Sequence, residues 1–569
     1  MLRNQIIAAL KEATGSADVE LFAPENPAHG HYSTNVAMKL AKTQKKNPLE
    51  VAQALNQQLT GNQQLFEKIE VASPGFINFW LAPQTLEEEL RRIRNDERVK
   101  NPNLDGKKIM VEYTDPNPFK EFHIGHLYTN IIGETLARLL EAQGAVVRRA
   151  NYQGDVGIHV AKAMWGLAKK MREENETVDS LGQKPLEERI RFMGQAYALG
   201  AAAFDDDAAA KEDITNLNKK IYDLDPDIRN LYEQGRQWSL DKFEEIYKRL
   251  GTQFDFYYFE REVGKVGWDL VKENLAKGIF EESDGAVIFP GERYGLHRRV
   301  FINSRGLPTY EAKDLGLAAL KAQDFPYDLS IVVTANEINE YFKVILAALN
   351  QIRTDLASKI KHLGHGVVRF ASGKMSSRTG NVVTAEGLLD DIKNRAQELM
   401  ASLRNEFTTE EKENISETVT LAAVKYALLK SHLGQDIIFD YEKSLSLTGD
   451  SGPYLQYTYT RLRSVLEKAG AEASVIDLSL LEKDEEKNLA RQLLYFPEEV
   501  ARAADRLEPN IVADYLYKLA NAANSFYEHA PILKAEGDLR QTRLALTQLA
   551  ATVLKQGLYL LGIAAPEKM

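Results

Sequence analysis

The stretch KIMVEYTDPNPFKEFHIGHLYTNIIGETLARLLEAQGAVVRRANY, residues 108–152, decides the fold. It opens with a β-type run at Lys108–Tyr113 and a Pro/Asn-rich turn. Apolar residues near one face of a helix follow, and Gly144 stands where that helix would stop. Residues 146–152 form a second β-type run. Strand, turn, helix and strand predict a βαβ unit, and therefore a parallel sheet.

The rest of the chain predicts further domains around this unit. The compact apolar run GFINFWL at residues 75–81 alternates as a strand does, and the sheet pattern resumes at Leu329–Thr334. From about Ala385 onward nearly everything is helical by period. We predict an α+β N-terminal domain (1–105), a Rossmann-type α/β catalytic domain (106–395) with an insertion near 170–300, a helical connecting region (396–450) and an all-α C-terminal bundle (451–569).

Composition narrows the class of protein. The 569 residues carry 71 basic and 82 acidic side chains, a net charge of −11, which excludes a broadly basic nucleic-acid coat but leaves room for a local basic groove. Cysteine is absent, so disulfides, thiolate metal sites and a cysteine nucleophile are excluded. No stretch approaches the ~20 apolar residues of a membrane span. We expect a cytoplasmic protein without a membrane segment.

The tetrapeptide His123-Ile124-Gly125-His126 stands where a strand gives way to a helix N-terminus. Free N–H groups there favour phosphate, and parallel sheets bind nucleotides at this edge. Gly125 would let a ribose or a base approach the backbone closely. Taken alone, the motif could equally be a surface histidine pair that caps a helix.

A second element, Gly373–Gly380 (GKMSSRTG), is a glycine-bounded loop with two cations and three hydroxyls, which suits a polyphosphate. An isolated basic loop is more often a solvated turn. Each motif follows a predicted strand of one sheet, so both can face the same crevice at the carboxyl ends of the strands.

Together the two motifs resemble the HIGH and KMSKS signatures of the class I aminoacyl-tRNA synthetases. Lys374, Met375 and Ser376 match the second signature, while Ser377 replaces its second lysine and Arg378 its last serine. Arg378 is a candidate substitute for the lost charge. The resemblance implies that ATP is bound by the set His123, Gly125, His126, Lys374, Ser376 and Arg378, and that His123, His126 and Lys374 are catalytic.

Within the class, the block at residues 111–157 and the run LPTYEAKDLGLA at residues 307–318 resemble arginyl-tRNA synthetase. The resemblance implies an arginine pocket made by Glu112, Asn117, Tyr310 and Asp314. A planar, five-donor guanidinium needs carboxylates placed to accept its fork. Each acid could instead be a cap or a surface ion pair, and Tyr310 a core aromatic. In VVTANEINEYF, Glu337 and Glu340 depart from the Gln and His common in the family.

The resemblance further implies activation of L-arginine by ATP with Mg²⁺ as counter-cation, and then transfer to tRNA(Arg), without a side-chain nucleophile or a protein-held metal. A monomer is expected. Candidate tRNA contacts are Tyr32 and Asn35 in the N-terminal domain, and Tyr459, Arg461 and Arg463 at the start of the C-terminal domain. A ring to stack on and an amide that reads a base edge are what an unpaired RNA base requires.

Two other functions stay open at the level of the sequence. One is a different adenylyl-transferring enzyme, although small adenylating enzymes lack a large helical C-terminal domain, and a synthetase for an apolar amino acid would not need two pocket acids. The other is a catalytically idle RNA-binding paralogue, which the retention of His123, His126 and Lys374 disfavours.

Overall fold

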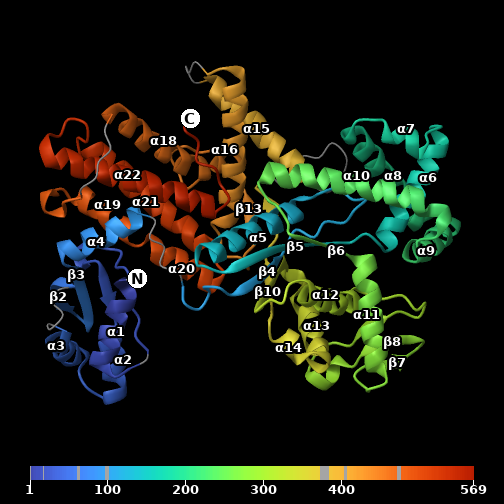
Figure 1. Cartoon of the computed structure of the whole chain (residues 1–569), viewed down its shortest axis with the longest axis horizontal. Coiled ribbons are helices and arrows are strands. Elements are labelled where there is room, and N and C mark those ends of the chain that lie inside the picture. The colour runs from blue at the N-terminus through green and yellow to red at the C-terminus, as the bar shows by residue number, and fades with distance from the viewer. Residues whose placement is uncertain are drawn as a thin grey trace. The chain divides into compact units, whose positions relative to one another are not determined.

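The computed structural model describes residues 2–16, 18–59, 65–95, 101–371, 384–402, 407–470 and 476–569. The chain forms two compact units. One consists of Met1–Pro102, Phe407–Tyr426 and Lys443–Met569, and the other of Asn103–Glu406 and Ala427–Glu442. The second unit contains the predicted parallel sheet (Figure 1).

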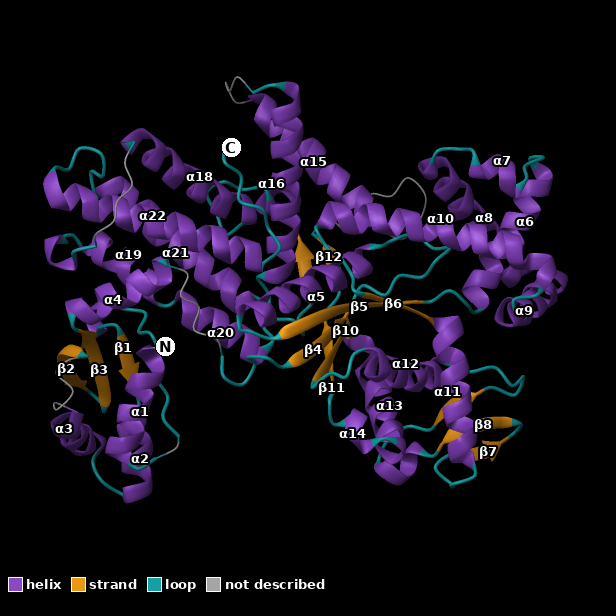
Figure 2. Cartoon of the chain, in the orientation of Figure 1, coloured by secondary structure: helices purple, strands orange, loops and turns teal. Residues whose placement is uncertain are grey.

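A five-stranded parallel sheet forms the centre of the second unit, in the order β11-β10-β4-β5-β6 (Figure 2). Its strands are β4 (Lys108–Glu112), β5 (Val146–Gln153), β6 (Phe256–Phe259), β10 (Leu329–Ala335) and β11 (Ile360–His365). The chain runs from β4 through helix α5 (Ile124–Ala142) to the neighbouring strand β5. Gly144 follows the helix with a φ of 96°, a conformation that glycine adopts without strain. The predicted βαβ unit is confirmed.

Helices cover the sheet. Helix α5 packs on β4, β5 and β10. Met110 of β4 instead joins a buried cluster with Val263 and Leu317, which come from α11 (Glu260–Leu275) and α12 (Tyr310–Asp324). Because side chains alternate along a strand, Met110 and Glu112 point to the same face. Glu112, at the carboxyl end of β4, therefore lies on the face that α11 and α12 cover.

The predicted insertion near 170–300 consists of several pieces. Its helical part holds α6 (Ile158–Glu173), α7 (Val178–Gly182), α8 (Leu186–Asp206), α9 (Ala208–Asp223) and α10 (Pro226–Leu250). Strand β6 follows and belongs to the central sheet. The prediction of one continuous insertion near 170–300 is therefore wrong at residues 256–259. After α11 comes a small antiparallel sheet of β7 (Glu281–Ser283), β8 (Ala286–Phe289) and β9 (Arg299–Ile302).

The remaining elements of the second unit follow β10. They are α13 (Asn339–Ile352), α14 (Thr354–Ala357), β12 (Val368–Phe370) and α15 (Ala385–Ser402). Strand β12 pairs in parallel with β13 (Ile437–Phe439), which is the one strand after Ala385 among the described residues. The expectation of a nearly all-helical C-terminal part holds apart from this three-residue strand.

The first unit combines an antiparallel sheet with a helical bundle. The sheet, in the order β1-β3-β2, contains β1 (Tyr32–Thr34), β2 (Phe66–Ala72) and β3 (Phe76–Leu81). Helices α1 (Leu2–Thr14), α2 (Val36–Gln44), α3 (Pro48–Leu59) and α4 (Pro83–Arg94) accompany it. The bundle contains α16 (Thr409–Leu429), α17 (Tyr441–Ser444), α18 (Gly452–Ala469), α19 (Asp484–Leu494), α20 (Phe496–Arg506), α21 (Asn510–His529) and α22 (Gly537–Leu560). None of the described helices is long and apolar enough to cross a membrane.

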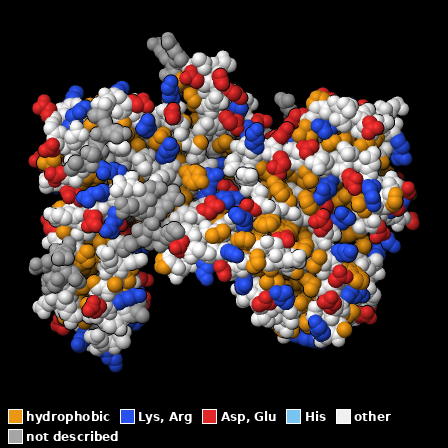
Figure 3. Space-filling model, in the orientation of Figure 1, with side chains coloured by type: hydrophobic (Ala, Val, Ile, Leu, Met, Phe, Trp, Pro, Cys, Tyr) orange, Lys and Arg blue, Asp and Glu red, His pale blue; other side chains and the backbone are white. Residues whose placement is uncertain are grey.

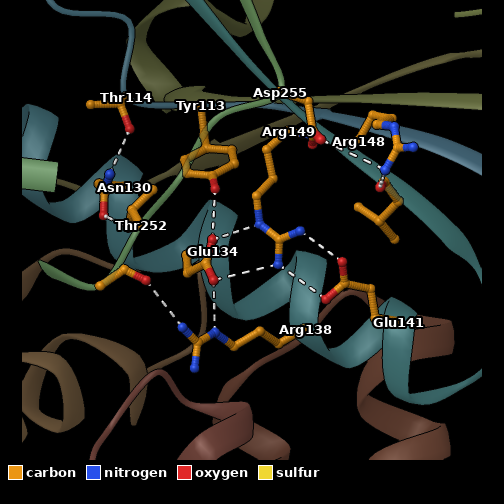
Figure 4. Close-up of polar contacts among 12 residues, drawn as sticks. Tyr113, Thr114, Asn130, Glu134, Arg138, Glu141, Arg148, Arg149, Thr252 and Asp255 are labelled. Atoms are coloured by element: carbon orange, nitrogen blue, oxygen red, sulfur yellow. Dashed lines mark hydrogen bonds and ion pairs between the residues drawn. The ribbon is translucent and has the colours of Figure 1, made fainter. Parts of the chain in front are cut away.

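A buried charge network fixes α5 against the sheet (Figure 4). Glu134, in the middle of α5, accepts hydrogen bonds from Tyr113 Oη at 2.8 Å, Arg149 Nε at 2.8 Å and Arg138 Nε at 2.7 Å. Arg149 also donates to Glu141 at 2.7 Å. Burial opposes ionisation of Glu134, yet the two arginines lower the pKa of its carboxyl below the usual range. The network joins the strand pair β4–β5 to the helix between them.

We expect Glu134→Gln to lower the free energy of unfolding by about 3 kcal/mol, because removing one partner of a buried charge pair leaves the other uncompensated. Since the pKa of Glu134 is lower in the folded state, this stabilisation is present above the unfolded pKa and is lost as pH falls through the folded pKa. Denaturant unfolding at several pH values measures both effects.

The matched control is Glu292→Gln, which removes an ion pair with Arg298 whose side chains are 54% and 57% exposed. Its effect should stay within about 0.5 kcal/mol. Equal, small losses for both variants would contradict the anchoring role of Glu134.

Candidate active site

The two histidines of the first motif cap helix α5. His123 is the N-cap residue, and its Nδ1 accepts a hydrogen bond from the Gly125 backbone N–H at 3.1 Å. His126 Nδ1 accepts from the His123 backbone N–H at 3.3 Å. The two imidazole rings stack with centroids 3.6 Å apart. This arrangement of the His123 ring requires glycine at position 125, because a Cβ there would lie 2.9 Å from the ring.

These contacts set the protonation of both rings. A ring nitrogen that accepts a hydrogen bond carries no proton, so the proton of each neutral imidazole lies on Nε2. Burial lowers the pKa of His123, and the charge of Lys120 lowers it further. Burial also lowers the pKa of His126, with smaller contributions from His123 and Lys120. The helix N-terminus therefore carries two neutral Nε2–H donors beside its backbone N–H groups.

We predict that ring ¹⁵N NMR finds the Nε2–H tautomer for both histidines and protonation midpoints below 6.5, the ordinary value. The unfolded chain in denaturant, where both midpoints should return to about 6.5, is the control. Midpoints at or above 6.5 in the folded protein, or protons on Nδ1, would contradict this assignment.

The chain that leaves the second motif lies beside the first. Thr384 forms an isolated antiparallel bridge with His123, and the Ala385 N–H donates to the Phe122 carbonyl at 2.9 Å. Lys374, Ser376 and Arg378, predicted to bind ATP, lie outside the described residues. The described contact still joins the segment after the second motif to the first motif, as the prediction of a shared crevice requires.

An acidic group lies at the carboxyl end of β4. Glu112 is buried, and its Oε2 accepts a hydrogen bond from Lys321 Nζ at 2.5 Å. Asp115 accepts from the Tyr152 backbone N–H at 2.8 Å. Burial raises the pKa of Asp115, and the charge of Glu112 raises it further, against the effects of Tyr152 and Lys321. Asp314, on α12, completes the group.

Among the predicted pocket residues, Asp314 has a strongly raised pKa. Tyr341 Oη donates to its Oδ2 at 2.6 Å. Burial raises the pKa of Asp314 to about 8, and the charges of Glu112 and Glu260 contribute, while the Tyr341 hydrogen bond opposes the rise. The positive charge of a cation that enters this site would favour the ionised form of Asp314.

Asn117 lies in a strained turn close to the end of β5. Thr114, Asp115 and Phe119 all have positive φ, at 82°, 48° and 68°. A Cβ at Gly154 would lie 2.1 Å from Asn117 Oδ1, so only glycine allows this approach. Strain of this kind persists where the surroundings hold it, often at functional sites.

The predicted pair Tyr310 and Asp314 lies on one helix, because α12 begins at Tyr310. Tyr310 is not a core aromatic, since its side chain is 55% exposed. Lys313 Nζ lies 4.8 Å from the centre of its ring and donates to Glu260 at 2.6 Å within the protein. Glu337, by contrast, is exposed beyond the end of β10.

Sequence reasoning missed Lys321 and Tyr341, the direct partners of the two pocket acids. A signal for Lys321 exists: it follows Asp314 by seven residues on the same helix, which is two turns and therefore the same face. No local signal identifies Tyr341, because it comes from α13.

The N-terminal tRNA prediction needs a correction. The Tyr32 ring is 1% exposed, and its hydroxyl donates to Glu498 Oε1 at 2.5 Å within the first unit. It also packs edge-on against Tyr495, with ring centroids 5.8 Å apart. A ring buried this way cannot stack on a base in the described arrangement. Asn35, the N-cap residue of α2, is partly exposed.

The C-terminal candidates, all on α18, differ from one another. Tyr459 is 4% exposed, which excludes base stacking in the described arrangement. Arg461 donates to Asn524 at 2.7 Å, and its guanidinium lies over the Tyr457 ring at 4.7 Å. The side chain of Arg463 is 43% exposed, and its guanidinium lies 3.8 Å from the Glu467 carboxylate.

No group of three or more potential metal-ligating side chains occurs among the described residues.

Comparison with known proteins identifies relatives along the whole chain. Family models match as "tRNA synthetases class I (R), catalytic domain" at residues 90–441, "Arginyl tRNA synthetase N terminal domain" at residues 1–81 and "DALR anticodon binding domain" at residues 455–569. The arginine–tRNA ligase of Fusobacterium nucleatum is 32% identical over 563 residues, covering 97% of this chain and 95% of that protein. That of Bacteroides fragilis is 31% identical over 598 residues, covering 100% and 99%.

Solved structures agree. Thermus thermophilus arginyl-tRNA synthetase superimposes with a TM-score of 0.83 at 26% identity, over 100% of both chains. The Plasmodium falciparum arginyl-tRNA synthetase, at 22% identity, has the same fold with a TM-score of 0.82 over 100% of this chain and 99% of that one.

Proposed function

The chain belongs to the arginyl-tRNA synthetase family and is a class I arginine–tRNA ligase, and we propose that it works with the residue roles given below. The observation that carries the proposal is the placement of two neutral Nε2–H donors at a helix N-terminus, on the same strand end as a group of carboxylates. Phosphate and guanidinium are the matching ligands.

In the first step, a carboxylate oxygen of L-arginine attacks the α-phosphorus of ATP, the bond to the β-phosphate oxygen breaks, and pyrophosphate leaves. The protein's task is to align the reactants and to stabilise charge on the phosphates. His123 and His126 donate from Nε2 to phosphate oxygens, beside the backbone at Gly125. Lys374 acts on the leaving pyrophosphate, and Ser376 and Arg378 complete this ATP site. Mg²⁺ enters with ATP as its counter-ion.

Arginine binds through Asp314 and Glu112, with Asn117 and Tyr310 at the sides of the pocket. A guanidinium is permanently charged and offers a planar fork of donors, so it favours ionised Asp314 over the protonated form. In the second step, a hydroxyl of the 3′-terminal ribose of tRNA(Arg) attacks the carbonyl carbon of the adenylate, and AMP leaves.

We propose that tRNA is held by local contacts. The net charge is −11, and Figure 3 shows basic and acidic side chains intermixed over the visible face. Asn35 of the N-terminal part, and Arg461 and Arg463 of the domain resembling anticodon-binding domains, are the candidates that the described arrangement leaves. The domain boundaries near residues 105, 395 and 450, a monomeric state and a cytoplasmic location belong to the same proposal.

The direct test is ATP–pyrophosphate exchange with each common amino acid in parallel, with and without tRNA. Among the amino acids tested, we expect only arginine to support exchange, because citrulline and lysine lack the charged fork that paired acceptors recognise. Exchange with a different amino acid would overturn the arginine pocket. Exchange with none, from folded protein supplied with tRNA, would favour an idle paralogue.

A pH series tests Asp314. Because its pKa is about 8 and a cation prefers the ionised form, the KM for arginine should fall as the pH rises from about 7 to about 9. Asp314→Asn should raise this KM about tenfold or more and leave the KM for ATP near its original value. The variant also serves as the control, since its arginine KM should lose the pH dependence that Asp314 causes. A pH slope that persists unchanged in Asp314→Asn would refute the assignment.

A further inference from the structure

The ion pair between Glu112 and Lys321 is buried at both ends. The Nζ–Oε2 distance is 2.5 Å, and the side chains are 4% and 2% exposed. Lys321 is among the largest fully buried side chains of the described residues. Removing two charges from water costs free energy that their attraction barely returns, so such a pair is a weak source of stability. Stability alone therefore does not explain this lysine.

The lysine is placed by the helix that also carries Asp314. Lys321 lies two turns after Asp314 along α12, on the same face. From there it crosses to the carboxyl end of β4, where Glu112 ends the strand. Helix α12 thus supplies one pocket acid, Asp314, and also the ammonium group of Lys321, which donates to the other pocket acid, Glu112.

The charged groups around the ion pair also indicate a role for Lys321 in the pocket. Asp115 and Asp314 both interact with the charge of Glu112, and the pKa of each is raised, primarily by burial. Lys321 is the ammonium group that acts against this accumulation of negative charge.

We propose that Lys321 is a positioning residue of the arginine pocket, which fixes the carboxylate of Glu112 through Oε2 for recognition of the substrate's cationic groups. The inference rests on the proposed function, in which Glu112 contacts arginine. Lys321 itself touches no substrate, because its ammonium is engaged by Glu112 inside the protein.

The test is a double-mutant cycle with Glu112→Gln, Lys321→Met and the double variant, each assayed by tRNA-dependent ATP–pyrophosphate exchange. We expect Lys321→Met to raise the KM for arginine about tenfold or more and to change the KM for ATP by less than about twofold. If Lys321 acts through Glu112, the double variant should have the arginine KM of Glu112→Gln alone. Additive increases would overturn the proposal.

Arg138→Met is the control, because it removes a cation whose side chain is 14% exposed from an acid of the same unit, Glu134 of α5. It should lower the melting temperature while the KM for arginine stays within about twofold. A purely structural role for Lys321 predicts the same behaviour for Lys321→Met, and that result would overturn the proposal. If Lys321→Met does not fold, Glu112→Gln and the double variant decide: equal arginine KM values support the proposal, and a further increase in the double variant overturns it.

The outcomes separate this inference from the function it rests on. A normal arginine KM in folded Glu112→Gln would overturn the role of Lys321 while arginine-dependent exchange by the unsubstituted chain still stands. Absence of arginine-dependent exchange in the unsubstituted chain would instead count against the proposed function.

Discussion

The position of helix α5 is the constraint on which the site depends. Its first turn carries the two histidines, and its middle is fixed to β4 and β5 through Glu134 and Arg149. Because the histidine side chains themselves cap the helix, their Nε2–H groups point where the helix N-terminus already favours anions. A shift of the helix would move the cap, both donors and the backbone N–H groups together, so the buried charge network also fixes the position of the proposed phosphate site.

The second half of the site follows a different physical rule. On the other face of β4, burial raises the pKa of Asp115 and of Asp314, and the charge of buried Lys321, which donates to Glu112, acts against this rise at Asp115. In the proposed function, this acidic group binds the cationic amino acid, and the histidine-capped helix N-terminus at the same strand end binds the anionic nucleotide.

The sequence predicted the features that local patterns encode. The βαβ unit, the helix stop at Gly144 and the place of the histidine motif all follow from residues within one stretch. The features that the sequence analysis got wrong or missed depend on partners that lie far away along the chain. The sequence predicts that the Tyr32 ring stacks on a base, but its hydroxyl donates a hydrogen bond to Glu498, which lies 466 positions away in the same unit. The sequence analysis does not single out Lys321, and only the fold reveals that it donates to Glu112.

The measurement closest to the central claim is a crystal structure with a non-hydrolysable sulfamoyl analogue of arginyl-adenylate. We expect the guanidinium of the ligand to lie within hydrogen-bonding distance of Asp314 and Glu112. We further expect Lys321 to keep its bond to Glu112, and the histidine Nε2 atoms to face the group that replaces the phosphate. An analogue bound with its guanidinium away from both acids, or with Lys321 swung out to contact the ligand, would contradict these expectations.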